Sequence, residues 1–212
     1  MSTLSRITNY KYLNTFVLAV SFMTVAACSS SDDDNSSSTS VAAQAFDGTW
    51  DRDCTIENNG ASSFIDTVII DGDVSTRIRD THSDSGCQQL SSRSSYDVTV
   101  TYGESSVLPN SGLTAQTIDM VIGEVRFIPL TEAAVTAFNE SSLCGVNTYV
   151  LATASVVPLE CEILDFGTGN LHSIWAVDDD LLYFGNNPTD GLTPEDRPTT
   201  LDINAPFRLR GN

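Results

Sequence analysis

Basic residues are scarce in this sequence, and lysine is almost absent. Lys11 is the single lysine, and Lys and Arg together number 10 against 28 Asp and Glu, which gives a formal net charge of −18 at pH 7. Proteins that bind nucleic acid contact the phosphate backbone with clustered Lys and Arg side chains, and this sequence has no such cluster. The composition therefore excludes nucleic acid as a partner.

Residues that commonly carry catalysis or hold metal ions are few or isolated. The two histidines, His82 and His172, lie far apart in the sequence, and there is no Cys-x-x-Cys pair, so the ligand spacing of a zinc site is missing. Neither histidine lies in a nucleophile-elbow motif. The carboxylates of Asp71–Asp73 and Asp178–Asp180 have the spacing of turns rather than of a known calcium loop. We expect no enzymatic activity, no cofactor and no metal.

The sequence also lacks an apolar run long enough to span a membrane, which takes about 20 residues. The uncharged segment 12–27 is interrupted by polar residues and ends in small ones, and Arg6 and Lys11 precede it. A basic start, a short apolar stretch and small residues at the end are typical of a signal peptide. We predict that residues 1–27 form one.

The end of this segment, Val25-Ala26-Ala27-Cys28, resembles a bacterial lipobox. The resemblance implies that Cys28 becomes the first residue of the mature protein. It also implies that the Cys28 thiol carries lipid with palmitate among its acyl chains, which anchors the protein to a membrane. Ser29, rather than aspartate, follows the cysteine directly. This resembles the sequence of lipoproteins that Gram-negative bacteria sort to the outer membrane, and it implies that location. An uncleaved anchor helix and an ordinary signal peptide with a free Cys28 are the alternatives.

Serine and aspartate dominate the next segment, residues 28–45, which has almost no apolar side chain to bury. Such a segment cannot offset its conformational entropy, so we predict a disordered tether. Residues 46–212 are long enough for one domain with a sizeable core. We therefore expect three parts, which are the signal peptide, the lipidated cysteine with its tether, and one folded domain.

Alternation of apolar and polar residues with a period of two predominates after Phe46, which indicates β-strands. Turn residues predict hairpins over residues 63–79, around Asp71-Gly72-Asp73, and over residues 171–185, around Asp178-Asp179-Asp180. Further strands are predicted at residues 96–102, 149–159, 161–164 and 200–210, with a loop at 186–199.

Residues 117–129 predict two strand segments that meet at Gly123. The alternation places one apolar set, Ile118, Met120 and Ile122, on one face and a second set, Val121, Val125 and Phe127, on the other.

One helix is predicted at residues 132–141, with Thr131 placed to cap its first turn. Many short strands around one helix favour an all-β fold, an antiparallel barrel of eight to ten strands with one short inserted helix. A β-sandwich is the alternative.

The first predicted strand opens with Phe46-Asp47-Gly48-Thr49-Trp50, whose Gly-x-Trp resembles the opening motif of lipocalins and related calycin-like barrels. The resemblance implies a lipocalin-like barrel in which Gly48 and Trp50 begin the first strand and the tryptophan closes the bottom. It also implies that an arginine of the last strand, Arg208 or Arg210, packs across the indole as a cation–π contact. Similar bacterial lipoproteins of unknown function combine Gly-Thr-Trp and a nearby cysteine with the motifs found here at Leu182–Gly185, Arg197–Thr199 and Leu201-Asp202.

Four cysteines follow the lipobox, and export would place them where disulfides form. Three pairings are possible. We favour Cys54 with Cys87 and Cys144 with Cys161, because this arrangement ties the first strand to the early hairpin and the helix end to the strand after it.

These expectations lead to a binding role rather than a catalytic one. We predict a lipid-anchored envelope module that binds a small apolar molecule, with the membrane as one partner through the anchor. The alternative is a structural or protein-interaction lipoprotein with a filled core, which contacts an envelope protein through its acidic surface or the loop at 186–199. The side chains expected to line a cavity are the aromatic residues Tyr96, Tyr102, Phe127, Trp175, Tyr183 and Phe184.

Overall fold

The computed structural model describes residues 46–161, 169–186 and 191–211. The chain divides into two units, residues 1–36 and 37–212, and every described residue belongs to the second. The predicted signal peptide, Cys28 and the tether therefore lie outside the described residues, as does most of the strand predicted at 161–164. Their boundaries stay predictions.

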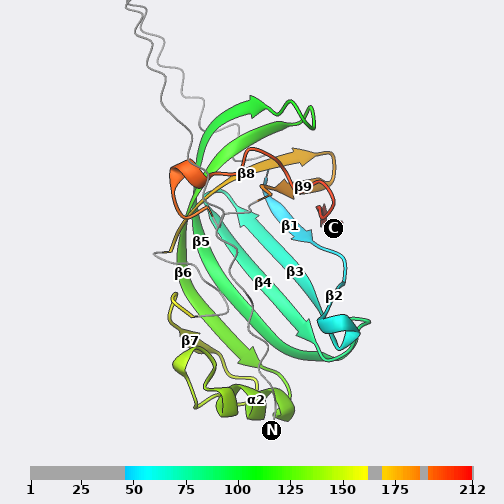
Figure 1. Ribbon diagram of the computed structural model, residues 1–212, viewed down its shortest axis with the longest axis vertical. Coiled ribbons are helices and arrows are strands. Elements are labelled where there is room, and N and C mark those ends of the chain that lie inside the picture. The colour runs from blue at the N-terminus through cyan, green and yellow to red at the C-terminus, as the bar shows by residue number, and fades with distance from the viewer. Residues whose placement is uncertain (1–45, 162–168, 187–190, 212) are drawn as a thin grey trace, which may run out of the picture. The chain divides into compact units, whose positions relative to one another are not determined.

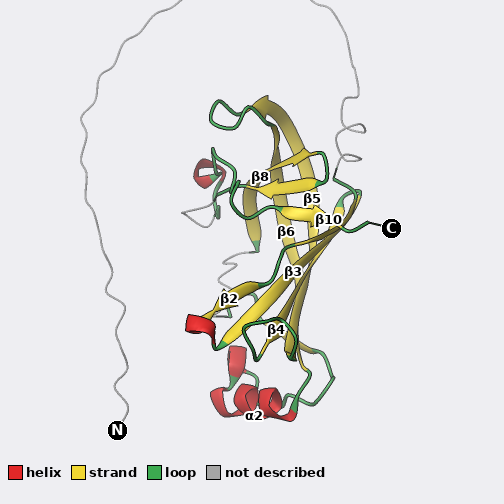
Figure 2. Ribbon diagram, turned by 90° about the vertical axis from the view of Figure 1, so that its right-hand side faces the viewer, coloured by secondary structure: helices red, strands yellow, loops and turns green. Residues whose placement is uncertain are grey.

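Eight antiparallel strands close into a barrel, which confirms the predicted fold class (Figures 1 and 2). Around the ring the order is β1, β10, β9, β8, β6, β5, β4 and β3, and the pairing of β1 with β3 closes it. The strands of the ring are β1 (Gly48–Asp51), β3 (Ser62–Asp71), β4 (Val74–His82), β5 (Leu90–Val107), β6 (Thr114–Pro129), β8 (Asn170–Asp178), β9 (Leu181–Phe184) and β10 (Phe207–Leu209).

The ring closes around only part of its long strands. β1 pairs with residues 67–70 of β3, whereas residues 62–64 of β3 pair with the short strand β2 (Thr55–Glu57). In the same way β8 pairs with residues 116–121 of β6, and residues 125–127 pair with β7 (Ser155–Val157). The strands β3 to β6 thus continue beyond the closed part as a curved sheet, and α2 (Glu132–Ser141) lies at that end (Figure 1).

Both predicted hairpins are confirmed, and their turns explain why. Asp71 pairs with Val74 and Asp178 with Leu181, so each turn has two residues. Gly72 and Asp179 have φ of 59° and 52°, the left-handed conformation that glycine, asparagine and aspartate adopt most readily in tight hairpins.

The predicted helix is confirmed as α2, where the Thr131 side chain accepts a hydrogen bond from the Ala134 N–H at 3.2 Å. Phe138 packs edge-on against Phe127 and Tyr149, with ring centroids 6.2 and 5.2 Å apart. Three short 3₁₀ helices, η1 (Asn58–Gly60), η2 (Leu143–Gly145) and η3 (Pro194–Asp196), lie in the connections.

The strand predicted at 149–159 is wrong in extent, because only Ser155–Val157 pairs in the sheet. Asn139 of α2 takes the place of a partner strand at Tyr149. Its Oδ1 accepts from the Tyr149 N–H at 2.7 Å, and its Nδ2 donates to the Tyr149 carbonyl at 3.0 Å. The helix thereby holds Tyr149 in the core, where its side chain is 2% exposed.

The break predicted at Gly123 is also wrong, because β6 runs on continuously as Thr114–Pro129. Tyr96 pairs with Val125 and Val98 pairs with Ile122, so Asp97 alone faces Gly123 and Glu124 in a β-bulge. The extra residue shifts the alternation by one. Val125 and Phe127 therefore join Ile118, Met120 and Ile122 in the core, whereas Val121 is 55% exposed.

The closing strand predicted at 200–210 shortens to β10, Phe207–Leu209. Leu201 makes one isolated bridge with Gly185, and turns around Asp202–Pro206 separate it from β10. The short strand still closes the ring, because it pairs with β9 on one side and β1 on the other.

The predicted disulfides are present. Cys54 and Cys87 are joined with their Cα atoms 6.0 Å apart, and Cys144 and Cys161 with theirs 4.8 Å apart. The first ties the start of β2 to the β4–β5 connection. The second ties η2, which follows α2, to the segment after β7.

Candidate functional site

Arg77 of β4 projects into the barrel. It lies in register with Val68 of β3 and Tyr96 of β5, and its guanidinium carbon is 4.0 Å from the ring centroid of Phe184 and 5.8 Å from that of Trp175. Among the described residues it has no hydrogen-bond or ion-pair partner. Burial lowers the pKa of Arg77, although the charges of Tyr96 and Asp66 oppose that shift.

Two further arginines stack on rings close to Arg77. Arg52 lies 4.6 Å from the Phe207 centroid and donates from Nη2 to the Ala205 carbonyl at 2.9 Å. Arg79 lies 4.0 Å from the Phe64 centroid. Of the eight arginines that the structure describes, three therefore stack on aromatic rings where the closed part of the barrel meets the open sheet.

Asp66, the carboxylate whose charge acts on both Arg77 and Arg79, is already paired. Asp66 receives the Arg79 Nε and Nη2 hydrogen bonds at 2.7 and 3.0 Å. This bidentate geometry uses both oxygens of the carboxylate. Arg77 lies two residues from Arg79 on the same face of β4, and Asp66 acts on it through long-range attraction without a hydrogen bond.

Buried polar atoms near Arg77 also go without partners in the described part of the chain. Ser75 Oγ, Trp175 Nε1 and Arg52 Nε are each enclosed with no hydrogen bond. Ser75 is 1% exposed and precedes Arg77 on the same face of β4, and Trp175 is fully buried. Native proteins satisfy most of their buried polar atoms, so this concentration inside one barrel marks the interior as the candidate site. The fourth such atom, His82 Nδ1, belongs to a residue that pairs with Ser63 near the Cys54–Cys87 disulfide.

The structure brings together most of the aromatic residues predicted to line a cavity, but it packs them against one another. Trp175 contacts Phe46, Tyr102 and Phe184 edge-on, with centroids 5.8, 6.4 and 5.2 Å apart. Burial raises the pKa of Tyr102 to about 12, and its hydroxyl donates to the Gly72 carbonyl at 2.8 Å. Tyr183 lies in a separate apolar cluster with Ile174 and Leu201.

Two cavities lined by described residues lie away from these aromatic side chains. One, of about 490 Å³, is beside the Cys144–Cys161 disulfide. The other, of about 270 Å³, is at Asn186 and residues 195–200.

The predicted contact between Trp50 and Arg208 is not formed. Trp50 is 2% exposed, and its Nε1 donates to the Phe46 carbonyl at 2.8 Å. Arg208 is exposed and lies in register with Asp51, the outward neighbour of Trp50. Arg210 instead makes a bidentate pair with Asp51, at 2.6 and 2.7 Å. Gly48 does open β1, with φ of 145° and the Trp50 ring beside it.

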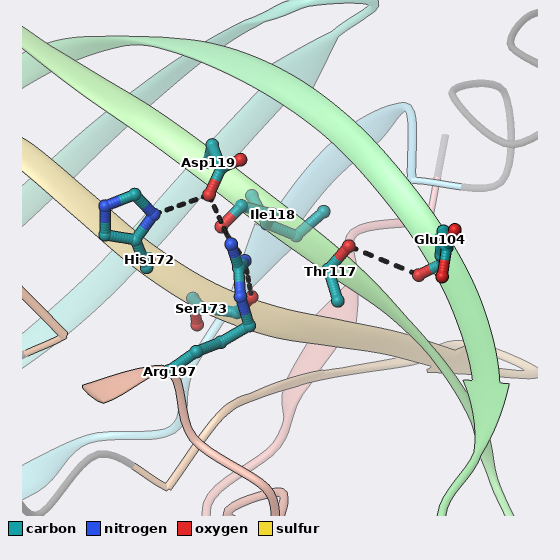
Figure 3. Close-up of polar contacts among 7 residues, drawn as sticks. All are labelled: Glu104, Thr117, Ile118, Asp119, His172, Ser173 and Arg197. Atoms are coloured by element: carbon teal, nitrogen blue, oxygen red, sulfur yellow. Dashed lines mark hydrogen bonds and ion pairs between the residues drawn. The ribbon is translucent and has the colours of Figure 1, made fainter. Parts of the chain in front are cut away.

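A second polar cluster, on the outside of the barrel, is centred on Asp119 (Figure 3). Asp119 Oδ1 lies 2.6 Å from His172 Nδ1 and accepts from Arg197 Nη2 at 2.5 Å, and Arg197 Nη1 donates to the Ile118 and Ser173 carbonyls at 2.8 and 2.9 Å. Partial desolvation raises the pKa of Asp119, but the hydrogen bonds from His172 and Arg197 outweigh it and leave the pKa below its usual value. The cluster's groups bind one another, so it fastens the Arg197 segment to β6 and β8.

Sequence reasoning missed Arg77 because the alternation around it is misleading. Val74, Thr76 and Ile78 form the more apolar row of β4, which would place Arg77 outside. The pairing with Val68 and Tyr96 turns the other row inward. The signal that could have found the site is the Arg77-Ile78-Arg79 repeat in a chain with so few basic residues.

In the described part of the chain, no helix is long and apolar enough to cross a membrane. The described His, Cys, Asp and Glu side chains form no group of three that could hold a metal ion. No protein-family model matches the sequence, and a search of curated proteins finds no match either.

Proposed function

We propose that the protein is a lipid-anchored binding module of the bacterial envelope, whose barrel interior takes up a small, largely apolar molecule. The observation that carries the proposal is a set of polar groups among aromatic rings that have no partner among the described residues, namely the buried Ser75 Oγ and Trp175 Nε1 and the half-buried Arg77. The role is binding rather than catalysis.

Groups of this kind cost stability when they stay unpaired. A buried donor without an acceptor costs about 1–3 kcal/mol, and a buried charge without a partner costs more. Selection for stability alone would favour apolar side chains of similar size at these positions. A ligand that supplies acceptors to the donors and apolar surface to the rings would offset the cost when it binds.

The location rests on the resemblance of Val25-Ala26-Ala27-Cys28 to a lipobox and on Ser29 after it. Attachment through Cys28 to the outer membrane of a Gram-negative bacterium would keep the barrel at the envelope. The two disulfides fit an oxidising compartment of that kind.

A structural or protein-interaction lipoprotein with a filled core is the second candidate. It is favoured by the aromatic packing around Trp175, whose ring contacts Phe46, Tyr102 and Phe184 edge-on, because small barrels can be filled by their own side chains. The two candidates differ in whether a small molecule accompanies the native protein.

Native mass spectrometry of the full chain, isolated from its own envelope in a non-ionic detergent, tests both parts of the proposal. We expect a polypeptide that lacks residues 1–27 and carries lipid on Cys28, together with a small molecule that leaves on denaturation. A polypeptide that retains residues 1–27, or has an unmodified Cys28, contradicts the anchor. Protein without a bound molecule contradicts the ligand and supports the filled-core alternative.

A further inference from the structure

We infer that the molecule held in the barrel carries an anionic group, and that Arg77 binds this group inside the barrel with Ser75 and Trp175 as neighbouring donors. The inference rests on the proposed function, because it assumes that the interior takes up a ligand. It adds the chemical class, an amphipathic anion with a carboxylate, sulfonate or phosphate on an apolar body.

The distribution of charge gives the first argument. The chain has a net charge of −18, yet Arg52 and Arg77 both lie against aromatic rings of the barrel, and the exposed Arg79 follows Arg77 on the same face of β4. Asp66 neutralises Arg79 through a bidentate pair. Arg77 has no such partner among the described residues, and the charge of Arg52 adds to the positive potential there. A region enclosed by apolar walls concentrates that potential and attracts an anion.

The chemistry of the unpartnered groups gives the second argument. A guanidinium and an indole N–H donate hydrogen bonds and accept none, and a serine hydroxyl can donate as well. Trp175 is fully buried, with 0% of its surface accessible to solvent, and Ser75 is 1% exposed. Groups of this kind are satisfied by a ligand rich in acceptors, and an anionic oxygen is the strongest acceptor available to them.

The rings around Arg77 define the rest of the ligand. Phe184 and Trp175 lie within 5.8 Å of the guanidinium carbon, and Phe207 lies 5.0 Å from Phe184. An anion bound to Arg77 would have its apolar part against these rings, where burial of apolar surface stabilises the complex.

A pair of fluorescent probes that differ in one group tests the inference. 8-Anilinonaphthalene-1-sulfonate is an aromatic anion, and N-phenyl-1-naphthylamine is the same ring system without the sulfonate. Each is titrated into the full chain anchored in phosphatidylcholine vesicles, and binding is measured by energy transfer from Trp50 and Trp175 to the probe. We expect the sulfonate to bind at least about tenfold more tightly than the neutral probe.

Arg77→Met keeps an apolar stem of similar length and removes the charge, so it should abolish the preference for the sulfonate. Arg208→Met is the matched control, because it removes the same charge from an exposed arginine of β10, and it should keep the preference. Arg77→Lys should keep part of it. Urea unfolding of Arg77→Met without probe should show unchanged or higher stability, since the variant removes a partly desolvated charge that has no ion-pair partner among the described residues.

The outcomes separate the inference from the proposed function. Equal binding of both probes by the wild type, or a preference that survives in Arg77→Met, overturns the anionic group and leaves an apolar binding module. Failure of both probes to bind overturns the proposed function and the inference together. A loss of stability in Arg77→Met, with Arg77→Lys binding no sulfonate, assigns Arg77 a structural role and also overturns the inference.

Discussion

Asp119 is a single residue that connects three parts of the outer surface, because its Oδ1 contacts both His172 of β8 and Arg197 of the segment before β10. Its pKa is lowered, so the stabilisation is present above the ordinary pKa of aspartate, about 3.9. It is lost as the pH falls through the lower pKa of the folded state. The Asp119 side chain is 50% exposed, so solvent weakens these interactions.

We expect Asp119→Asn to lower the free energy of unfolding by about 1 kcal/mol at pH 7. The difference from the wild type should shrink in acid below about pH 4, where the wild-type carboxylate takes up a proton. Urea denaturation at a series of pH values measures this. A gap that stays constant into the acid range contradicts the assignment of the effect to the Asp119 charge.

Residues differ in how far the sequence determines their role. The four disulfide cysteines were predictable, because a single pairing joins elements that are neighbours along the chain. Arg77 was not, because the inward row of a strand depends on its register with β3 and β5 rather than on its own alternation. The predicted contact between Trp50 and Arg208 was wrong for the same reason, since the register of β10 with β1 places Arg208 on the outer face.

At the scale of elements, α2 begins at a cap that can be tested on its own. Thr131 accepts the Ala134 N–H and has an extended backbone, as an N-cap residue does. We expect Thr131→Ala to cost about 1 kcal/mol of stability, measured by urea denaturation. Thr136→Ala is the matched control, because Thr136 is exposed within the same helix and alanine favours helix. Equal effects of the two substitutions contradict the cap.

Elements with local signals were predicted well, and those held by distant contacts were not. The hairpin turns and α2 carry their turn and cap residues in the adjacent sequence. The continuity of β6 depends on Asp97 of β5, which faces both Gly123 and Glu124. The shortness of β7 depends on Asn139, a helix residue that binds the Tyr149 backbone. Asp97 and Asn139 lie outside the segments whose structure they determine, so the sequence of those segments alone does not indicate the effect.

Across the whole molecule, the few positive charges are divided between two uses. Arg79, Arg93, Arg126, Arg197 and Arg210 pair with carboxylates on or near the surface. Arg77 and Arg52 face aromatic rings instead. The described surface keeps a large excess of carboxylates, which favours solubility, while two of the arginines that lack an acidic partner in the described chain lie against aromatic rings.

The two disulfides stabilise the molecule to different extents. They close loops with sequence separations of 33 and 17 residues, for which the loss of entropy in the unfolded chain predicts about 4 and about 3 kcal/mol. We expect the double substitution of Cys54 and Cys87 by alanine to lower the free energy of unfolding more than that of Cys144 and Cys161. Urea denaturation of both variants measures the order, and adding a reductant to the wild type should cost about as much as both together. The reverse order would show that the contacts around buried Cys161, which is 4% exposed, outweigh the chain entropy of the longer loop.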